Sequence, residues 1–296
     1  MSRILVVGGS GLLGSRLIEM LGAADNSVSA TYFSNKIARE GCETFQMDIA
    51  DGRRVDEVIE TVQPDTVINA SGERNTRYCE KNPHEAYRVN VEGTQNLVEA
   101  CRAGGAKLVF ISSDLVFDGS KGSYGEEDEV CPLSVYGKQK VMAEKIIKDQ
   151  LDSWLILRAS SIYGWNPKRD NFVSWVLQEL KKGQGLDIVY DQYITPVYVG
   201  SLAEMLIELL ENNKRGLYHV GEGECLSKYE FVVRIAEVFG LDRKLVKPVP
   251  SDTLGQSIKM PKKNCLDLTK ISSQMDLSRY NLIAGLQAMK KEALSA

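Results

Sequence analysis

Short apolar runs alternate with amphipathic patterns along the first half of the chain, and each kind of segment predicts a different element. Unbroken apolar runs predict buried strands, whereas apolar residues that recur every three or four positions predict helices. Strands that are apolar on both faces and separated by helices are typical of a parallel sheet covered on both sides. The first half therefore predicts an α/β fold with a Rossmann-like doubly wound parallel sheet. We expect strands at Ile4–Val7, Val28–Tyr32, Thr66–Asn69, Lys107–Ile111 and Trp154–Leu157, and helices at Leu12–Leu21, Val55–Val62, Pro83–Gly104 and Tyr136–Lys148.

This alternation weakens beyond Arg158. Helical patterns continue there, but Pro248, Pro250 and Pro261 interrupt a region with little periodicity. We therefore expect a sheet domain made of residues 1–160 and 197–220, and a smaller, discontinuous part made of 161–196 and 221–296. In the second half we expect helices at Phe172–Leu180, Ser201–Leu210 and Lys228–Phe239, and a strand at Leu217–Val220.

Composition and charge narrow the class of protein. Hydrophobic residues make up 43% of the 296 residues and charged residues 26%, which is ordinary for a soluble globular protein. The net charge of -4 argues against a nucleic-acid partner, because proteins that bind phosphate backbones usually carry a basic surplus. No apolar stretch approaches the ~20 residues of a membrane span, and Ile4–Val7 is too short for a signal peptide. We expect a cytoplasmic protein with neither a membrane nor a nucleic acid as partner.

The cysteines and histidines predict neither disulfides nor a metal site. The six cysteines are dispersed and form no C-x-x-C pair, so we expect free thiols in a reducing cytosol. His84 and His219 are far apart and lack acidic residues at ligand spacing. The cysteines are Cys42, Cys79, Cys101, Cys131, Cys225 and Cys265.

A glycine-rich loop lies between the first expected strand and the first expected helix. Gly9, Gly11 and Gly14 have the G-x-G-x-x-G spacing, and Gly8, Gly11 and Gly14 also fit G-x-x-G-x-x-G. Glycines allow the tight turn and a close approach of the backbone to a dinucleotide diphosphate, and the helix N-terminus favours its negative charge. The loop predicts a nicotinamide dinucleotide site.

The choice of dinucleotide depends on the end of the second strand. An NAD enzyme usually places an acidic residue there, about 20 residues after the loop, to accept the ribose hydroxyls. This chain has no carboxylate between Thr31 and Lys36, while Ser34 and Lys36 offer groups that suit a 2′-phosphate. We favour NADP(H) and leave NAD(H) open, since Lys36 is alternatively an ordinary solvated loop lysine.

A serine, a tyrosine and a lysine carry the strongest chemical signal. Ser113 ends an apolar strand, and Tyr136 and Lys140 lie four residues apart on an expected helix. The ammonium of Lys140 is expected to lower the pKa of the Tyr136 phenol, so that the tyrosine acts as a general acid. The Ser113 hydroxyl is expected to orient the substrate oxygen. Together with the glycine loop, the three residues predict hydride transfer to or from a carbonyl, which is an oxidoreductase reaction.

Further segments extend this pattern over nearly the whole chain, and together they resemble a known family. The sequence resembles the extended short-chain dehydrogenase/reductases, and within them the dTDP-4-dehydrorhamnose reductase (RmlD-like) group. The matching segments are Gly8–Gly14, Asp48-Ile49, Asn69–Gly72, Asn90–Thr94, Ser112–Gly119, Pro132–Lys138, Asn171–Val173, Asp191-Gln192 with Pro196, and Asn264–Asp267.

The resemblance implies an NADP(H)-dependent reductase of a nucleotide-linked 4-keto-6-deoxysugar in dTDP-rhamnose biosynthesis. The sheet domain would then bind NADP(H) and the smaller part would bind the sugar nucleotide, with a homodimer left open. By the resemblance Asp48 accepts the adenine amine, although a helix cap is the alternative for Asp48 and a structural turn for Ser71-Gly72. The expected cofactor-binding residues are Gly8, Ser10, Gly11, Leu12, Leu13, Gly14, Tyr32, Ser34, Lys36, Asp48, Ile49, Ala70, Ser71, Gly72, Asn90, Tyr136 and Lys140, and the expected substrate-binding residues are Ser113, Asp114 and Ser161.

Two positions depart from the group, which commonly has tyrosine where this chain has Leu115 and tryptophan where it has Ser161. These departures weaken the assignment of the sugar more than that of the reductase chemistry. The regulatory subunit of methionine adenosyltransferase also resembles this group, so a non-catalytic, cofactor-binding subunit is one alternative. A nucleotide-sugar epimerase or dehydratase, in which the cofactor is regenerated, is another.

Overall fold

The computed structural model describes residues 2–24, 26–166, 171–255 and 258–295, which form two compact units. The first unit comprises Met1–Val116, Ser134–Arg158 and Leu206–Tyr218, and the second comprises Phe117–Leu133, Ala159–Met205 and His219–Ala296. The segment 117–133 therefore belongs to the second unit, because its strand β6 (Gly122–Tyr124) pairs with β14 (Asn264–Leu266). The segment that returns to the first unit is 206–218, shorter than the 197–220 expected from the sequence.

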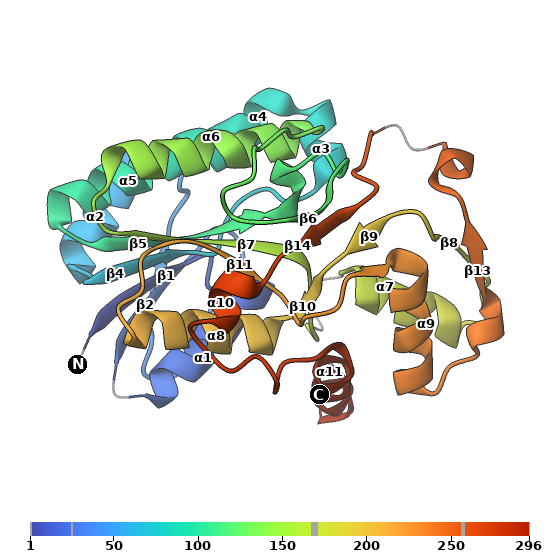
Figure 1. The fold of residues 1–296 in the computed structure, drawn as a ribbon. Coiled ribbons are helices and arrows are strands. Elements are labelled where there is room, and N and C mark those ends of the chain that lie inside the picture. Colours follow the sequence, from blue (N-terminus) through green and yellow to red (C-terminus); the bar gives the residue numbers. More distant parts are fainter. Residues whose placement is uncertain (1, 25, 167–170, 256–257, 296) are drawn as a thin grey trace. The chain divides into compact units, whose positions relative to one another are not determined.

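Parallel strands form the centre of the first unit. Its sheet has the order β7-β5-β4-β1-β2-β3, which is the arrangement of a Rossmann fold. Helices α2, α5 and α6 cover one face, and α1 lies against the other (Figure 1). The α/β expectation is confirmed. The strands are β1 (Arg3–Val7), β2 (Ser27–Tyr32), β3 (Glu43–Gln46), β4 (Thr66–Asn69), β5 (Lys107–Ser113) and the start of β7 (Trp154–Tyr163); the helices are α1 (Leu12–Ala23), α2 (Gly52–Val62), α3 (Thr76–Lys81), α4 (Pro83–Tyr87), α5 (Gly93–Gly104) and α6 (Val135–Gln150).

The core of this unit explains why these elements form. Leu5, Val67 and Leu108 on neighbouring strands are fully buried, as are Leu97 on α5 and Ile147 on α6. Burying such side chains between the sheet and these helices stabilises each by roughly 1.5–3 kcal/mol.

The single long helix expected from Pro83 to Gly104 is divided into three parts. After α4, residues Arg88–Glu92 form a π-helical turn, and α5 follows from Gly93. Within this turn the side chain of Asn90 is buried. Turns of this kind often occur at functional sites.

The second unit contains short strands and helices with clear end signals. Helix α9 (Lys228–Phe239) begins with a capping box between Ser227 and Glu230 and ends at Gly240, whose φ is 70°. Three two-stranded sheets pair β12 with β9, β13 with β8 and β14 with β6, while β10 pairs with the end of β7. The remaining elements are α7 (Phe172–Lys181), β8 (Leu186–Val189), β9 (Tyr193–Ile194), β10 (Pro196–Tyr198), α8 (Val199–Glu211), β11 (Gly216–Val220), β12 (Leu226–Ser227), β13 (Val246–Val249), α10 (Thr269–Ser272) and α11 (Leu282–Ser295), with α8 and β11 shared with the first unit.

Two cysteines of this unit form a disulfide, so the expectation of free thiols throughout is wrong for this pair. Cys225 and Cys265 are joined across 40 residues, with their Cα atoms 5.6 Å apart, well within disulfide range. Cys225 precedes β12 and Cys265 lies in β14, so the pairing depends on strand placement that dispersed positions do not reveal. The thiols of Cys42, Cys79, Cys101 and Cys131 are free.

Within the described part of the chain, no helix combines the length and apolar composition that crossing a bilayer requires.

Candidate active site

The glycine loop joins β1 to α1 and leaves this helix without a side-chain cap. Gly11 N–H donates to the Gly8 carbonyl over 2.9 Å, which closes the turn. A Cβ at Gly14 would collide with the Gly8 carbonyl oxygen, so only glycine fits there. No side chain caps α1 at Gly11, and its first N–H groups can therefore bind an anion. The loop, which also contains Ser10, Leu12 and Leu13, fits a dinucleotide diphosphate.

The segment Ala70–Gly72 follows β4 at the same carboxyl edge of the sheet. A Cβ added at Gly8 would lie 2.9 Å from the Ser71 Cβ, so the two loops are in close contact. The Ser71 hydroxyl donates to Asn69 Oδ1 over 2.6 Å. Gly72 has a φ of 130°, and a Cβ there would lie 2.9 Å from Asn90 Oδ1 and 3.9 Å from Lys140 Nζ. Glycine at this position lets the loop approach the expected catalytic lysine.

Asn90 holds this loop and helix α6 together. Its Oδ1 accepts the Glu73 N–H at 2.8 Å, and its Nδ2 donates to the Glu73 carbonyl and to Gln139 Oε1, both at 2.9 Å. Asn90 is 3% exposed. Since both polar atoms of its side chain bond to protein groups, Asn90 positions the loop, and its expected contact with the cofactor stays a prediction.

Ser113, Tyr136 and Lys140 all lie in the first unit, where β5 ends and α6 begins. Ser134 caps α6 by accepting the Gly137 N–H, and this places Tyr136 and Lys140 one turn apart near the start of the helix. All three side chains are buried, and a hydrogen bond joins Ser113 to Tyr136. Lys140 Nζ donates to the Ile111 carbonyl at 2.9 Å and lies 5.8 Å from the centre of the Tyr136 ring. The structure thus brings the three expected catalytic residues together.

The pKa of Tyr136 moves in the direction opposite to the one expected from the sequence. Burial raises the pKa of this phenol well above its ordinary value, the Asp114 carboxylate raises it further, and the hydrogen bond with Ser113 lowers it only in part. Burial outweighs any lowering of this pKa by Lys140, whose ammonium donates to the Ile111 carbonyl. Tyr136 therefore keeps its proton at neutral pH, which is the form that a general acid needs.

Lys140 has an unusually low pKa for a lysine. Burial lowers the pKa of its ammonium to about 8, against the opposing effect of the Glu144 carboxylate. Its Nζ lies 4.4 Å from the centre of the Phe110 ring, a position that favours a cation. At pH 7 the ammonium form predominates, and above pH 8 it is progressively lost.

Asp114 and Leu115 border the triad. Asp114 is 6% exposed and its Oδ1 accepts the Ser113 hydroxyl at 3.0 Å, so the carboxylate orients the serine. The backbone N–H of Leu115 donates to Ser113 Oγ at 3.1 Å. The Leu115 side chain packs against Cys79 and Tyr136, which gives the leucine a packing role in place of the usual tyrosine.

The residues expected around the adenosine also follow strands at the carboxyl edge. Tyr32 ends β2, and Ser34 and Lys36 beyond it are exposed. Asp48 and Ile49 follow β3; Asp48 Oδ1 accepts the Ala50 N–H at 3.0 Å. The alternative of a helix cap for Asp48 is wrong, because Asp51 caps α2.

Ser161 lies in the second unit, near the end of β7. Its φ of 44° is rare for a residue other than glycine. In the pairing with β10, Pro196 lies opposite Ser160 and Val197 opposite Ile162, so Ser161 is the extra residue of a β-bulge. Its side chain is exposed.

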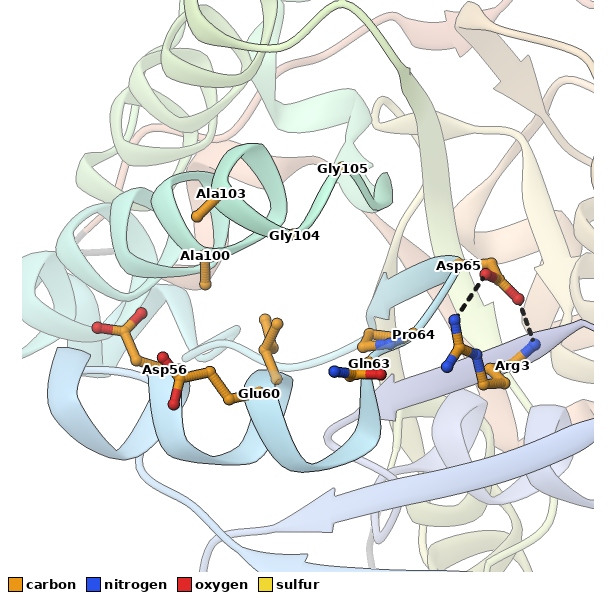
Figure 2. Close-up of a pocket in the computed structure, with 11 residues that line it drawn as sticks. Arg3, Asp56, Glu60, Gln63, Pro64, Asp65, Ala100, Ala103, Gly104 and Gly105 are labelled. Atoms are coloured by element: carbon orange, nitrogen blue, oxygen red, sulfur yellow. Dashed lines mark hydrogen bonds and ion pairs between the residues drawn. The ribbon is translucent and has the colours of Figure 1, made fainter.

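A hollow of about 390 Å³ opens at the opposite, amino edge of the sheet (Figure 2). Asp56 and Glu60 on α2 and Ala100 and Ala103 on α5 line it, and Arg3 pairs with Asp65 at its side. Ligands of open α/β sheets bind outside the carboxyl ends of the strands. This hollow contains none of the expected site residues.

Sequence reasoning missed the groups beneath the triad, above all Glu144 and Arg158. Glu144 continues the spacing of Tyr136 and Lys140 by another four residues, a signal that was available in the sequence. Its carboxylate accepts hydrogen bonds from Ser112 and Arg158, and all three side chains are buried. Among the described residues, no group of three or more His, Cys, Asp or Glu side chains is placed to hold a metal ion.

Comparison with known proteins shows the family of this chain. Residues 1–294 match the family model described as the RmlD substrate binding domain. The chain belongs to this family. The chain is therefore an NAD(P)-dependent oxidoreductase of the extended short-chain dehydrogenase/reductase type, and it is similar to dTDP-4-dehydrorhamnose reductases.

Individual relatives cover nearly the whole chain. The dTDP-4-dehydrorhamnose reductase of Aggregatibacter actinomycetemcomitans is 33% identical over 92% of each protein, and the probable low-salt glycan biosynthesis reductase Agl14 of Haloferax volcanii is 31% identical over 96% of each. The beta subunit of methionine adenosyltransferase 2 from Pongo abelii is 30% identical over 92% of this chain and 82% of that protein. A dTDP-4-dehydrorhamnose reductase structure from Bacillus anthracis, in complex with NADP, matches with a TM-score of 0.88 and 27% identity over 98% of this chain and 99% of that one.

Proposed function

We propose that this chain is a reductase of a nucleotide-linked 4-keto-6-deoxysugar that uses NADP(H) in preference to NAD(H). The observation that carries the proposal is the buried cluster of Ser113, Tyr136 and Lys140, in the same compact unit as the glycine loop. The names of the relatives support the substrate class, since three of the four described above are reductases of sugar or glycan biosynthesis.

The residues of the first unit fit a nicotinamide dinucleotide. The cradle at Gly14 and the uncapped start of α1 would hold its diphosphate, and Ala70–Gly72 would line the path toward Lys140. When bound, the reduced cofactor supplies a hydride for the carbonyl carbon.

Tyr136, Ser113 and Lys140 then have distinct tasks. The Tyr136 phenol donates its proton to the carbonyl oxygen; a raised pKa does not prevent this, because an alkoxide is a stronger base than a phenolate. The Ser113 hydroxyl, oriented by Asp114, donates to the same oxygen once it has turned from the carboxylate. Lys140, as an ammonium ion, stabilises the phenolate that remains and holds the nicotinamide ribose.

The preference for NADP(H) rests on the loop after β2. Ser34 and Lys36 are exposed there, and the stretch from Thr31 to Lys36 has no carboxylate that would repel a 2′-phosphate. The bound NADP of the Bacillus anthracis relative supports the same choice.

Following NADPH oxidation against a panel of nucleotide-linked 4-ketosugars tests the proposal. One NADPH should be consumed for each sugar reduced, whereas an epimerase or dehydratase would convert the sugar without net oxidation.

A second candidate is a regulatory subunit, which the similarity to methionine adenosyltransferase 2 subunit beta favours. In that case the protein would bind the dinucleotide and a partner enzyme, reduce no ketosugar, and be recovered with a stoichiometric partner.

A further inference from the structure

A third ionisable residue continues the line of Tyr136 and Lys140 along α6. Glu144 follows Lys140 by four residues, as Lys140 follows Tyr136, so the three lie on one face of the helix. Glu144 is 3% exposed, and this face is buried against the sheet. A carboxylate in such a place needs partners, because burying an unpaired charge is strongly unfavourable.

Two neighbouring strands supply these partners. Glu144 Oε1 accepts the Ser112 hydroxyl at 2.6 Å and Arg158 Nε at 2.9 Å, and Oε2 accepts Arg158 Nη2 at 2.7 Å. Ser112 lies in β5 directly before Ser113, and Arg158 lies in β7, the next strand of the sheet. Lys148, which is partly exposed, approaches Oε2 at 3.4 Å.

The arrangement does more than fill the core. Replacing a buried ion pair by apolar residues of similar size often leaves stability unchanged or improves it, so stability alone does not account for Glu144 and Arg158. What Glu144 does is geometric: by accepting the Ser112 hydroxyl it links strand β5, which carries Ser113, to helix α6, which carries Tyr136 and Lys140. It also places a negative charge one turn from Lys140.

We propose that Glu144 is a positioning residue, whose buried carboxylate keeps Lys140 an ammonium ion and fixes Ser113 opposite Tyr136. The inference rests on the proposed reductase function for its kinetic part. Its electrostatic part concerns the protein alone and can be measured without a substrate.

The groups around Lys140 support this role. Burial lowers the pKa of Lys140 to about 8, and Glu144 is the first of the groups that oppose this effect. The Cys79 thiol on α3 also faces it, but burial raises the pKa of this thiol to about 11. Tyr136 is neutral as well, because burial raises its pKa. Near pH 8 the negative charge of Glu144 therefore opposes the loss of the Lys140 proton. Burial would raise the pKa of the Glu144 carboxyl, but its bonds with Arg158 and Ser112 outweigh burial and lower this pKa.

The test is the pKa of Lys140 in Glu144→Gln, measured by NMR on protein with ¹³C-labelled lysine. The Lys140 signal is assigned by its loss in Lys140→Met. Removing a charge one helical turn away should lower this pKa by about one to two pH units. Asp149→Asn, which removes an exposed carboxylate from the same helix, should leave the Lys140 pKa within about 0.3 units of its wild-type value. An unchanged Lys140 pKa in Glu144→Gln would overturn the proposal.

Kinetics provide the second measurement. In Glu144→Gln the upper limit of the pH–rate profile should move down with the Lys140 pKa, so that a loss of about tenfold at pH 8 shrinks to within about threefold at pH 6. A loss of equal size at every pH would show a merely structural role.

If Glu144→Gln does not fold because Arg158 is left partly unpaired, Glu144→Gln with Arg158→Met removes both charges and undergoes the same titration. If the wild type reduces no ketosugar, the reductase proposal fails, and the NMR titration still decides the electrostatic one.

Discussion

Replacing Tyr136 by phenylalanine should abolish most of the turnover while leaving the fold and the cofactor site intact. The ring of Tyr136 packs with Cys79 and Ala86, and phenylalanine keeps these contacts. The hydroxyl that is lost makes a hydrogen bond with Ser113, but Ser113 Oγ keeps its bonds to Asp114 and Leu115. No buried partner is left unsatisfied, so the free energy of unfolding should change by no more than about 1 kcal/mol.

The rate should change far more than the stability. A positioned general acid typically contributes about 10²–10⁴-fold, so the kcat of Tyr136→Phe should fall by roughly that factor. NADPH oxidation with the best ketosugar substrate measures this rate, while thermal unfolding and NADPH titration show that fold and cofactor binding are retained. Tyr78→Phe, at a tyrosine that is 40% exposed, is the matched control and should have wild-type turnover. If Tyr136→Phe retains more than about a tenth of the wild-type rate, Tyr136 is not the acid.

Three further predictions concern charges. Lys140→Met should reduce both turnover and NADPH affinity. In the wild type, both should decline as the pH rises through about 8, because burial lowers the pKa of Lys140 to about that value. Profiles of rate against pH and NADPH titrations between pH 6 and 10 measure this decline. Lys36→Ala should weaken NADPH binding roughly tenfold to hundredfold and leave NADH nearly unchanged in paired titrations, whereas equal changes would remove the 2′-phosphate contact. Burial raises the pKa of Glu222 to about 7 in the folded protein, so the contribution of Glu222 to stability is complete below about pH 4.5 and is lost as the pH rises through 7. The free energy of unfolding of the wild type, measured relative to that of Glu222→Gln, should therefore fall by about 3 kcal/mol over this pH range. A difference that does not change with pH would contradict the raised pKa.

Local patterns in the sequence predicted the sheet of the first unit well. The strands β1, β2 and β4 are formed by the expected residues or extend them by one, because continuous apolar runs have few alternatives in a parallel sheet. Strand β3 escaped prediction because Glu43 and Gln46 make it polar, as an edge strand tolerates. Helix α11 was not expected at all, although Leu282, Leu286 and Met289 on one face are buried.

The second unit and the electrostatics depend on contacts between distant segments, which local patterns do not encode. Strand β14 exists because it pairs with β6 far earlier in the chain, and the bond between Cys225 and Cys265 follows from similar long-range placement. In the candidate site, the spacing of Tyr136 and Lys140 was sufficient to predict that both lie on one buried face of a helix. It did not show that Lys140 turns to the Ile111 carbonyl, or that burial controls the pKa of both groups.

The most direct test of the central claim is the stoichiometry of NADPH consumed to sugar reduced, measured with purified protein and a nucleotide-linked 4-keto-6-deoxysugar. We predict one NADPH oxidised for each ketosugar converted to its 4-hydroxy product, with the rate reduced at least a hundredfold in Tyr136→Phe. Tight NADPH binding without oxidation across the whole panel would contradict the account and favour the regulatory subunit.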